Sequence, residues 1–287
     1  MASGEQRYFR QVQEAADFIA GRAGGLKPAL GLILGSGLGD LAEQVESPCP
    51  IHYADIPHFP VSTVAGHAGR LVLGRLEGKP VAVMQGRFHY YEGYAMRQVA
   101  FPVYVMKLLG ARALVITNAA GSLNRSFRPG DLMLIADHVN LTGANPLIGP
   151  NDDELGPRFP DMSEAYSRAY RQLAHRVAAG IRGDGGEPLR LGEGVYCGIA
   201  GPSYMTPAEL KMLARIGGDA VGMSTVGEVI AARHVGLDVL GISCITDMAI
   251  GDELEPLTHE QVVAVAERAK PKFAALVRAF VREVSLT

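Results

Sequence analysis

The sequence has few cysteines, little excess of charge of either sign and no long apolar run. Its three cysteines, Cys49, Cys197 and Cys244, are odd in number, far apart and in apolar contexts, which indicates reduced thiols rather than a disulfide framework. The formal net charge is −3 without a Lys/Arg-rich block, so we expect neither nucleic acid nor a membrane as a partner. No stretch reaches the roughly 18 apolar residues of a spanning helix, and the N-terminal residues lack a signal-peptide core. We therefore expect a soluble, cytoplasmic protein that binds small molecules.

The length of 287 residues, with 48% in the hydrophobic class, suffices for one sizeable α/β core. We expect a single domain over residues 1–287. Helical spacing of apolar residues predicts an opening amphipathic helix over residues 5–22. Most of the predicted strands are continuous apolar runs, which is typical of strands buried on both faces. These strands cover residues 30–34, 70–76, 80–85, 112–117, 131–137, 195–200, 219–223 and 237–246.

Helical patterns lie between these strands, and three of them carry start signals. Thr206, Thr225 and Thr258 are each followed three residues later by Glu or Gln, which is the spacing of a capping box. Strands that alternate with helices favour an α/β fold with a mixed central β-sheet and helices on both faces. Ligands are expected at the carboxyl ends of its strands. Asp247, which directly follows an apolar run, is expected at that edge.

A glycine-rich turn, LGSGLGD, follows the first predicted strand. Gly35, Gly37 and Gly39 do not have the last spacing of the dinucleotide fingerprint, so a nicotinamide-dependent oxidoreductase is only weakly indicated. Backbone N–H groups beside the Ser36 hydroxyl instead suit an anion of the size of phosphate. A plain strand exit without a ligand is the alternative.

Three other strand ends also suit an anion. Arg87 and His89 alternate with Phe88, which on an extended backbone places both donors on one face. The segment TNAAGSLN, residues 117–124, is predicted to be a small-residue turn that a ligand can approach closely. Ser224 stands at a strand-to-helix junction, where free N–H groups favour negative charge. Taken singly, these features also fit a solvated loop, an ordinary turn and a bare cap; together they point to one oxyanion site.

Eight segments between about residues 30 and 260 also carry a resemblance to a known family. They are LGSGLGD, FPVSTVAGHAGRLVLG, QGRFHYYEGY, TNAAGSLN, NPLIGPND, RFPDMSEAY, AGPSYMTPAE and AVGMSTVGEVIAARH. In this order they resemble the signature segments of the low-molecular-mass, trimeric purine nucleoside phosphorylases. The resemblance implies a homotrimer that uses no metal and no organic cofactor. It implies phosphorolysis of a purine (deoxy)ribonucleoside by orthophosphate, the co-substrate, to a free base and (deoxy)ribose 1-phosphate.

The resemblance also implies roles for individual residues. The sugar is expected against Tyr91 and Met223, and His259 is expected to face the 5′-hydroxyl. Phe159 resembles the aromatic residue that one subunit contributes to the site of its neighbour. Glu92 is expected to orient either His89 or Tyr91. The residues expected around the phosphate are Ser36, His67, Arg87, His89, Ala119 and Ser224, and those along the base are Ala120, Gly121 and Tyr204.

Two positions depart from the family pattern at the edge of the base. Family members that take 6-oxopurines hold the base with a Glu and an Asn, where this chain has Met205 and Asp247. A carboxyl at position 247 can accept a hydrogen bond from a 6-amino group and, when protonated, donate to N7 as a general acid. The substitutions therefore favour adenosine or another 6-aminopurine nucleoside.

Other substrates and functions stay open from the sequence. A 6-oxopurine enzyme would use water at positions 205 and 247. Phosphorylases of 5′-methylthioadenosine have an aspartate at the position of Asp247, but they lack the histidine that faces a free 5′-hydroxyl, and this chain has His259. A module that binds nucleosides without turnover would leave Arg87 and His89 without a role.

Overall fold

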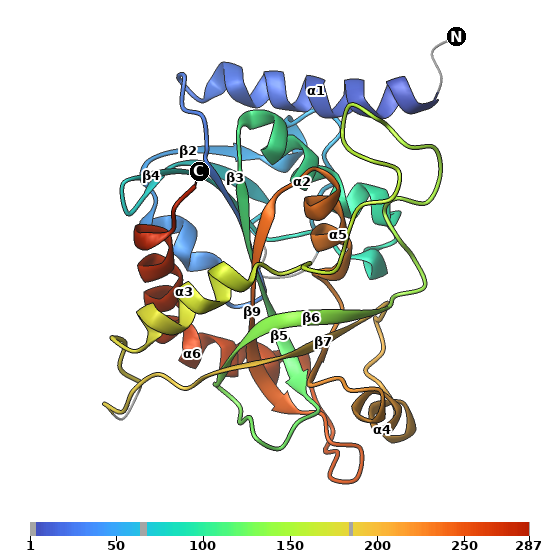
Figure 1. Cartoon of the computed structure of the whole chain (residues 1–287), viewed down its shortest axis with the longest axis vertical. Helices are drawn as coiled ribbons and strands as arrows, with labels where there is room; N and C mark the ends of the chain where they lie inside the picture. The colour runs from blue at the N-terminus through green and yellow to red at the C-terminus, as the bar shows by residue number, and fades with distance from the viewer. Residues whose placement is uncertain (1–3, 64–67, 184–185, 287) are drawn as a thin grey trace.

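A mixed β-sheet forms the centre of the computed structural model, which describes residues 4–63, 68–183 and 186–286 (Figure 1). The described residues form nine strands in the order β2-β3-β4-β1-β5-β8-β7-β6-β9. They are β1 (Leu30–Leu34), β2 (Glu46–His52), β3 (Arg70–Leu76), β4 (Lys79–Gln85), β5 (Ala113–Ser122), β6 (Leu132–Leu141), β7 (Leu191–Ile199), β8 (Ala220–Gly222) and β9 (Asp238–Met248).

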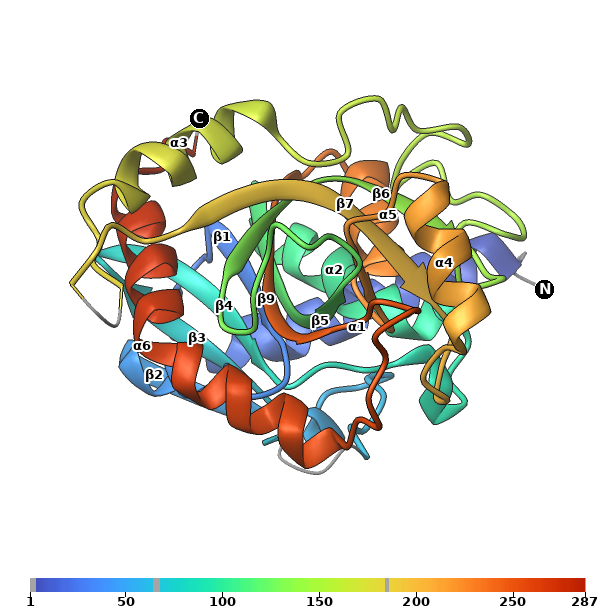
Figure 2. The same ribbon diagram turned by 90° about the horizontal axis from the view of Figure 1, so that it is seen from below.

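Strand β5 is the branch point of this sheet. It runs parallel to β1 on one side and parallel to β9 on the other, and its last residues pair with β8. Because β8, β7, β6 and β9 pair in succession, these four strands and β5 close into a ring (Figure 2). Strands β1, β4, β5 and β9 point the same way. Their carboxyl ends therefore meet at one edge of the sheet.

Helices cover both faces of the sheet, as the apolar pattern predicts. They are α1 (Gly4–Arg22), α2 (Met96–Leu109), α3 (Arg168–Ala178), α4 (Pro207–Arg215), α5 (Val226–His234) and α6 (His259–Glu283). Side chains of β1 alternate between the two layers: Ile33 packs in the cluster with α1, α2 and α5, whereas Leu32 packs with α3 and α6. In Figure 1 α1 lies along one end of the molecule and α3 lies beside α6. None of the described helices is long and apolar enough to cross a membrane.

The predicted strands match the structure closely, with β1 and β3 matching residue for residue. Two of the three predicted caps are also confirmed, because the hydroxyls of Thr206 and Thr258 accept hydrogen bonds at the first turns of α4 and α6. The helix start predicted at Thr225 is confirmed, because Thr225 is the N-cap of α5, but the predicted capping hydrogen bond is absent. The φ of Thr225 is +76°.

The interpretation of residues 117–124 as a turn is also wrong for most of the segment. Strand β5 continues to Ser122, because β9 pairs with it along its length and β8 pairs with its end. A segment rich in small residues is thereby held extended by neighbours that are distant in the sequence.

Candidate active site

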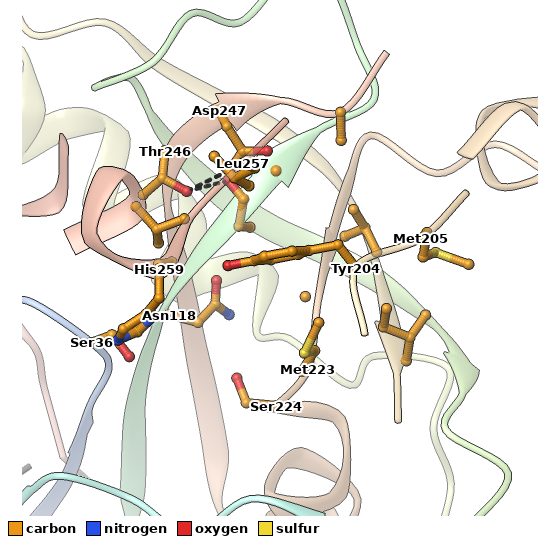
Figure 3. Close-up of a pocket in the computed structure, with 18 of the residues that line it drawn as sticks. Ser36, Asn118, Tyr204, Met205, Met223, Ser224, Thr246, Asp247, Leu257 and His259 are labelled. Carbon is orange, nitrogen blue, oxygen red and sulfur yellow. Dashed lines mark hydrogen bonds between the residues drawn. The ribbon is translucent and has the colours of Figure 1, made fainter. Parts of the chain in front are cut away.

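A pocket of about 320 Å³ lies where β1, β5 and β9 end (Figure 3). Its lining includes the turn after β1, the second half of β5 and the last residues of β9. The predicted site residues that line it are Ser36, Arg87, His89, Tyr91, Ala119, Ala120, Gly121, Tyr204, Met205, Met223, Ser224, Asp247 and His259. The fold thus gathers at one place most of the residues selected from the sequence.

One end of the pocket offers donors for an anion. Ser36 follows β1, and Ser224 is the first residue of the γ-turn that leads into α5. The N-terminus of a helix carries a partial positive charge and N–H groups without intrahelical partners. In Figure 3 Ser224 and Asp247 lie at opposite ends of the residues drawn. The pocket therefore has an end suited to an oxyanion and another that carries a carboxyl group.

Arg87 is the charged hydrogen-bond donor at the anion end, and hydrogen bonds to Glu228 and Thr117 fix its guanidinium group. Its Nε and Nη2 donate to Oε1 of Glu228 over 3.0 and 2.7 Å, and its Nη1 donates to the carbonyl oxygen of Thr117 over 2.5 Å. Arg87 is 1% exposed and Glu228 2% exposed, so both charges of this ion pair are shielded from solvent. A buried charge requires such a partner, because burying a charge without one costs roughly several kcal/mol of folding free energy.

His89 is oriented by Glu92. The Glu92 carboxylate accepts hydrogen bonds from His89 Nδ1 over 2.9 Å and from the backbone and hydroxyl of Thr63 over 2.8 and 2.6 Å. Burial alone would raise the pKa of Glu92, but the hydrogen bonds from His89 and Thr63 outweigh it and lower the pKa to about 2. The ring of Tyr91 stacks on that of His89 with centroids 4.6 Å apart. Glu92 thus fixes His89 directly and leaves Tyr91 to be positioned by stacking.

Asp247 is the titratable group at the other end of the pocket. Burial raises the pKa of this carboxyl, and the hydrogen bond from Thr246 Oγ1 to Oδ1, 2.8 Å long, opposes that rise in part. Tyr204 lies beside it, with a pKa raised by burial and by the charge of Asp247. A carboxyl whose ionised form is disfavoured can hold a proton and donate it.

Comparison with known proteins now places this pocket in a family. A family model described as the phosphorylase superfamily matches residues 29–282. Purine nucleoside phosphorylase 1 of Geobacillus stearothermophilus is 58% identical over 274 residues, which cover 96% of this chain and 97% of that protein. The chain belongs to the purine nucleoside phosphorylases of this superfamily. Purine nucleoside phosphorylase of Bos taurus is similar at 49% identity, with 86% of each chain covered.

Solved structures of the family share the fold. Isoform 2 of the Schistosoma mansoni phosphorylase, crystallised with cytosine and ribose 1-phosphate, superposes with a TM-score of 0.91 at 44% identity over 97% of this chain and 98% of that one. Another Schistosoma mansoni phosphorylase, crystallised with adenosine, gives a TM-score of 0.89 at 41% identity, covering 96% and 98% of the two chains. The similar structures include further complexes with inosine and with guanosine.

Three of the predicted site residues lie outside the pocket lining or outside the described residues. Glu92 does not line the pocket and contacts it through His89. Phe159 does not line the pocket of its own chain, and 86% of its surface is exposed. His67 lies outside the described residues.

Sequence reasoning missed three polar residues of this phosphorylase that hold the predicted ones in place. Glu228 was assigned to the first turn of α5 as a capping partner, yet it binds Arg87. Thr246 donates to Asp247, and Asn118 lines the pocket beside Ala119. Thr246 and Asn118 are each adjacent in sequence to a selected residue at a strand end, and this adjacency is the signal that could have found them.

Gly121 leaves the space that the Asp247 carboxyl occupies. A Cβ built at this glycine would lie 2.8 Å from Asp247 Oδ2 and 3.0 Å from the Ala249 side chain. We therefore expect Gly121→Ala to displace the carboxyl and to lower kcat/KM by at least about tenfold, measured with adenosine and phosphate. Gly180→Ala, where the nearest atom lies 3.7 Å away, is the control and should retain activity. Equal activity of the two variants would contradict this account.

Proposed function

We propose that this enzyme transfers the sugar of a purine nucleoside to orthophosphate, with a preference for 6-aminopurines such as adenosine. The observation that carries the proposal is a single pocket that Ser36, Arg87, Ser224 and Asp247 all line. Ser224 and Asp247 lie at opposite ends of the residues drawn in Figure 3. Membership of the purine nucleoside phosphorylases supports the reaction, and the residue at position 247 supports the preference. The reaction requires no metal or organic cofactor, only orthophosphate as co-substrate.

The anion end positions the nucleophile. Arg87, Ser36, Ser224 and the backbone at Ala119 would hold phosphate below C1′ of the sugar, with His89 and Tyr91 beside it. A phosphate oxygen forms a bond to C1′ while the bond from C1′ to N9 breaks and its electron pair moves onto the purine. Holding both reactants in one geometry removes much of the entropic cost of their encounter. The negative phosphate also stabilises the positive charge that develops on the sugar.

Asp247 would receive the base. Its raised pKa favours the protonated form, which can donate to N7 as negative charge develops on the purine. Its other oxygen can accept from the 6-amino group. Met205 also lines the pocket and offers only a weak sulfur acceptor, so it pairs poorly with the N1–H of a 6-oxopurine. The hydrogen-bonding groups of this edge therefore match adenosine better than inosine.

The competing preferences are 6-oxopurine nucleosides and 5′-methylthioadenosine. His259 lines the pocket and would face a free 5′-hydroxyl, which supports a nucleoside with that hydroxyl over 5′-methylthioadenosine. The family structures with adenosine, inosine and guanosine do not favour one base, because all three ligands occur among them.

Initial rates on adenosine, inosine, guanosine and 5′-methylthioadenosine, each with and without phosphate, test the proposal. We expect base release to require phosphate, adenosine to have the largest kcat/KM, and ribose 1-phosphate to appear in equal amount with adenine. Release of base without phosphate would exclude phosphorolysis. A larger kcat/KM for inosine would exclude the preference while leaving the reaction intact.

Phe159 is proposed to complete the pocket of a neighbouring subunit in a homotrimer. Its 86% exposure and its position outside its own pocket support this role. We expect Phe159→Ala to raise the KM for adenosine by roughly tenfold, since burying a large aromatic ring contributes about 1.5–3 kcal/mol. Ile216→Ala, which removes another exposed apolar side chain, is the control and should leave KM unchanged.

Mixed oligomers make this test specific. Phe159→Ala and Asp247→Ala damage different parts of the same composite site, so co-expression should regenerate some sites that contain both native residues. At an adenosine concentration well below KM, activity above that of either variant alone is expected, together with a molar mass of about three chains. A monomeric mass, or no recovery in the mixture, would overturn the contribution across subunits.

A further inference from the structure

The backbone at the entrance to α5 is strained. Thr225 has φ +76° and ψ −51°, and the N–H of Val226 donates to the carbonyl oxygen of Ser224 over 2.8 Å. These values define a γ-turn of the rare, strained kind centred on Thr225. A β-branched residue at positive φ is a genuine outlier and costs on the order of 1–3 kcal/mol. A glycine would avoid much of this cost, so the threonine side chain is the feature to be explained.

The Thr225 hydroxyl joins two pocket residues. Thr225 is fully buried, and its Oγ1 accepts a hydrogen bond from Asn118 Nδ2 over 2.9 Å. The same Oγ1 lies 3.1 Å from Ser224 Oγ. Because the amide nitrogen can only donate, Thr225 accepts from it, which leaves the Thr225 proton available for Ser224. We take Thr225 as the donor in this contact. Ser224 then retains its own proton for a ligand.

Asn118 presents an unusual acceptor to the same pocket. It is 2% exposed, and its Oδ1 has no hydrogen-bond partner within the described part of the chain. A buried polar atom without a partner is rare in proteins and calls for a specific explanation, such as a bound molecule or a catalytic role. The side chain lies between Ser224 and Tyr204 in the view of Figure 3 and lines the pocket.

We propose that Asn118, Thr225 and Ser224 form a hydrogen-bond relay that aims the Ser224 hydroxyl at the bound anion, while Asn118 Oδ1 accepts from a hydroxyl of the substrates. Thr225 is a positioning residue in this relay, and the strained γ-turn places its hydroxyl between the other two side chains. The acceptor at Asn118 selects a ligand that carries an O–H group beside the anion. That group is either a P–OH of phosphate or a hydroxyl of the sugar. The proposal rests on the proposed phosphate site at Ser224.

A matched pair of variants at Thr225 tests the relay. Thr225→Val keeps the shape and removes the hydroxyl, whereas Thr225→Ser keeps the hydroxyl. We expect Thr225→Val to raise the KM for phosphate by roughly three- to tenfold with a smaller change in the KM for adenosine, and Thr225→Ser to stay near the native value. In a Ser224→Ala background, Thr225→Val should have no further effect, because the end of the relay is gone. Equal phosphate KM values for the two Thr225 variants, or additive effects with Ser224→Ala, would overturn the relay.

Asn118→Ala tests the acceptor, and the choice of sugar identifies its donor. We expect a loss in kcat/KM of roughly tenfold or more. If the donor is the 2′-hydroxyl, the loss is confined to adenosine; if it is a P–OH or another sugar hydroxyl, adenosine and 2′-deoxyadenosine lose equally. In the second case, a rise in the KM for phosphate assigns the donor to the P–OH, and a rise in the KM for the nucleoside assigns it to the sugar. No loss with either substrate, in a variant of unchanged Tm, would overturn the acceptor role. Arg87→Ala distinguishes failure of the phosphate site from failure of the relay. An unchanged KM for phosphate in Arg87→Ala would refute the phosphate site itself. A raised KM in Arg87→Ala, together with Thr225 and Asn118 variants that behave like the native enzyme, would refute only the relay.

Discussion

Replacing Asp247 by asparagine is expected to lower the ratio of kcat/KM for adenosine over inosine by roughly ten- to a hundredfold. The asparagine amide can donate to O6 of inosine, but it has no acidic proton for N7 of the departing base. A buried hydrogen-bonding group left without its partner costs about 1–3 kcal/mol, which corresponds to this range of discrimination. The Asp247→Asn variant would then favour inosine, whose base edge the native carboxyl disfavours.

The measurement is a set of initial rates for both nucleosides at saturating phosphate, with the Tm of each variant as a control for folding. Adding Met205→Glu should further improve guanosine, because a carboxylate there can accept from its N1–H and 2-amino groups. Unchanged ratios in Asp247→Asn would refute the assigned role of this carboxyl. No gain from Met205→Glu would show that position 205 does not contact the base.

The raised pKa of Asp247 also predicts how stability depends on pH. As pH rises above the ordinary value of 3.8, the unfolded chain loses this proton before the folded protein does. The folded state then binds more protons than the unfolded state, so the free energy of unfolding falls as pH rises toward the raised pKa. Asp247→Asn lacks this titration, and its stability relative to the native protein should therefore increase over that interval. Chemical unfolding of both proteins across this interval measures the difference.

Arg87→Ala is the second change with a large expected effect. It should raise the KM for phosphate well over tenfold, since hydrogen bonds to charged groups contribute about 1.5–3 kcal/mol. It should also destabilise the fold by about 3–5 kcal/mol, because Glu228 would remain as a buried charge without its partner. Phosphate titrations and denaturant unfolding measure the two effects separately.

A double variant separates binding from stability. Arg87→Met combined with Glu228→Gln removes both charges and should recover most of the lost stability, yet phosphate binding should stay weak. Native phosphate dependence in Arg87→Ala would rule out the anion site. Recovery of phosphate affinity in the double variant would mean that Arg87 acts only through folding.

Local signals in the sequence predicted most of the fold and much of the site. Continuous apolar runs placed β1 and β3 at their observed bounds, and threonine caps placed the starts of α4 and α6. The sequence analysis did not predict helices α2 and α3 or strand β2. Helix α2 is buried along most of its length, and so it lacks an amphipathic pattern, while β2 is mostly exposed and contains two prolines at the sheet edge.

The amino-acid sequence by itself determined where strands end and which donors and acceptors follow them, because apolar runs, turns and caps depend on near neighbours. Only the tertiary structure decided what those residues do to one another. Glu228 pairs with Arg87 across 141 residues, burial raises the pKa of Asp247, and pairing with β9 turns a predicted loop into the second half of β5. Desolvation and long-range hydrogen bonds exist only once distant segments are packed together, so no local pattern encodes them.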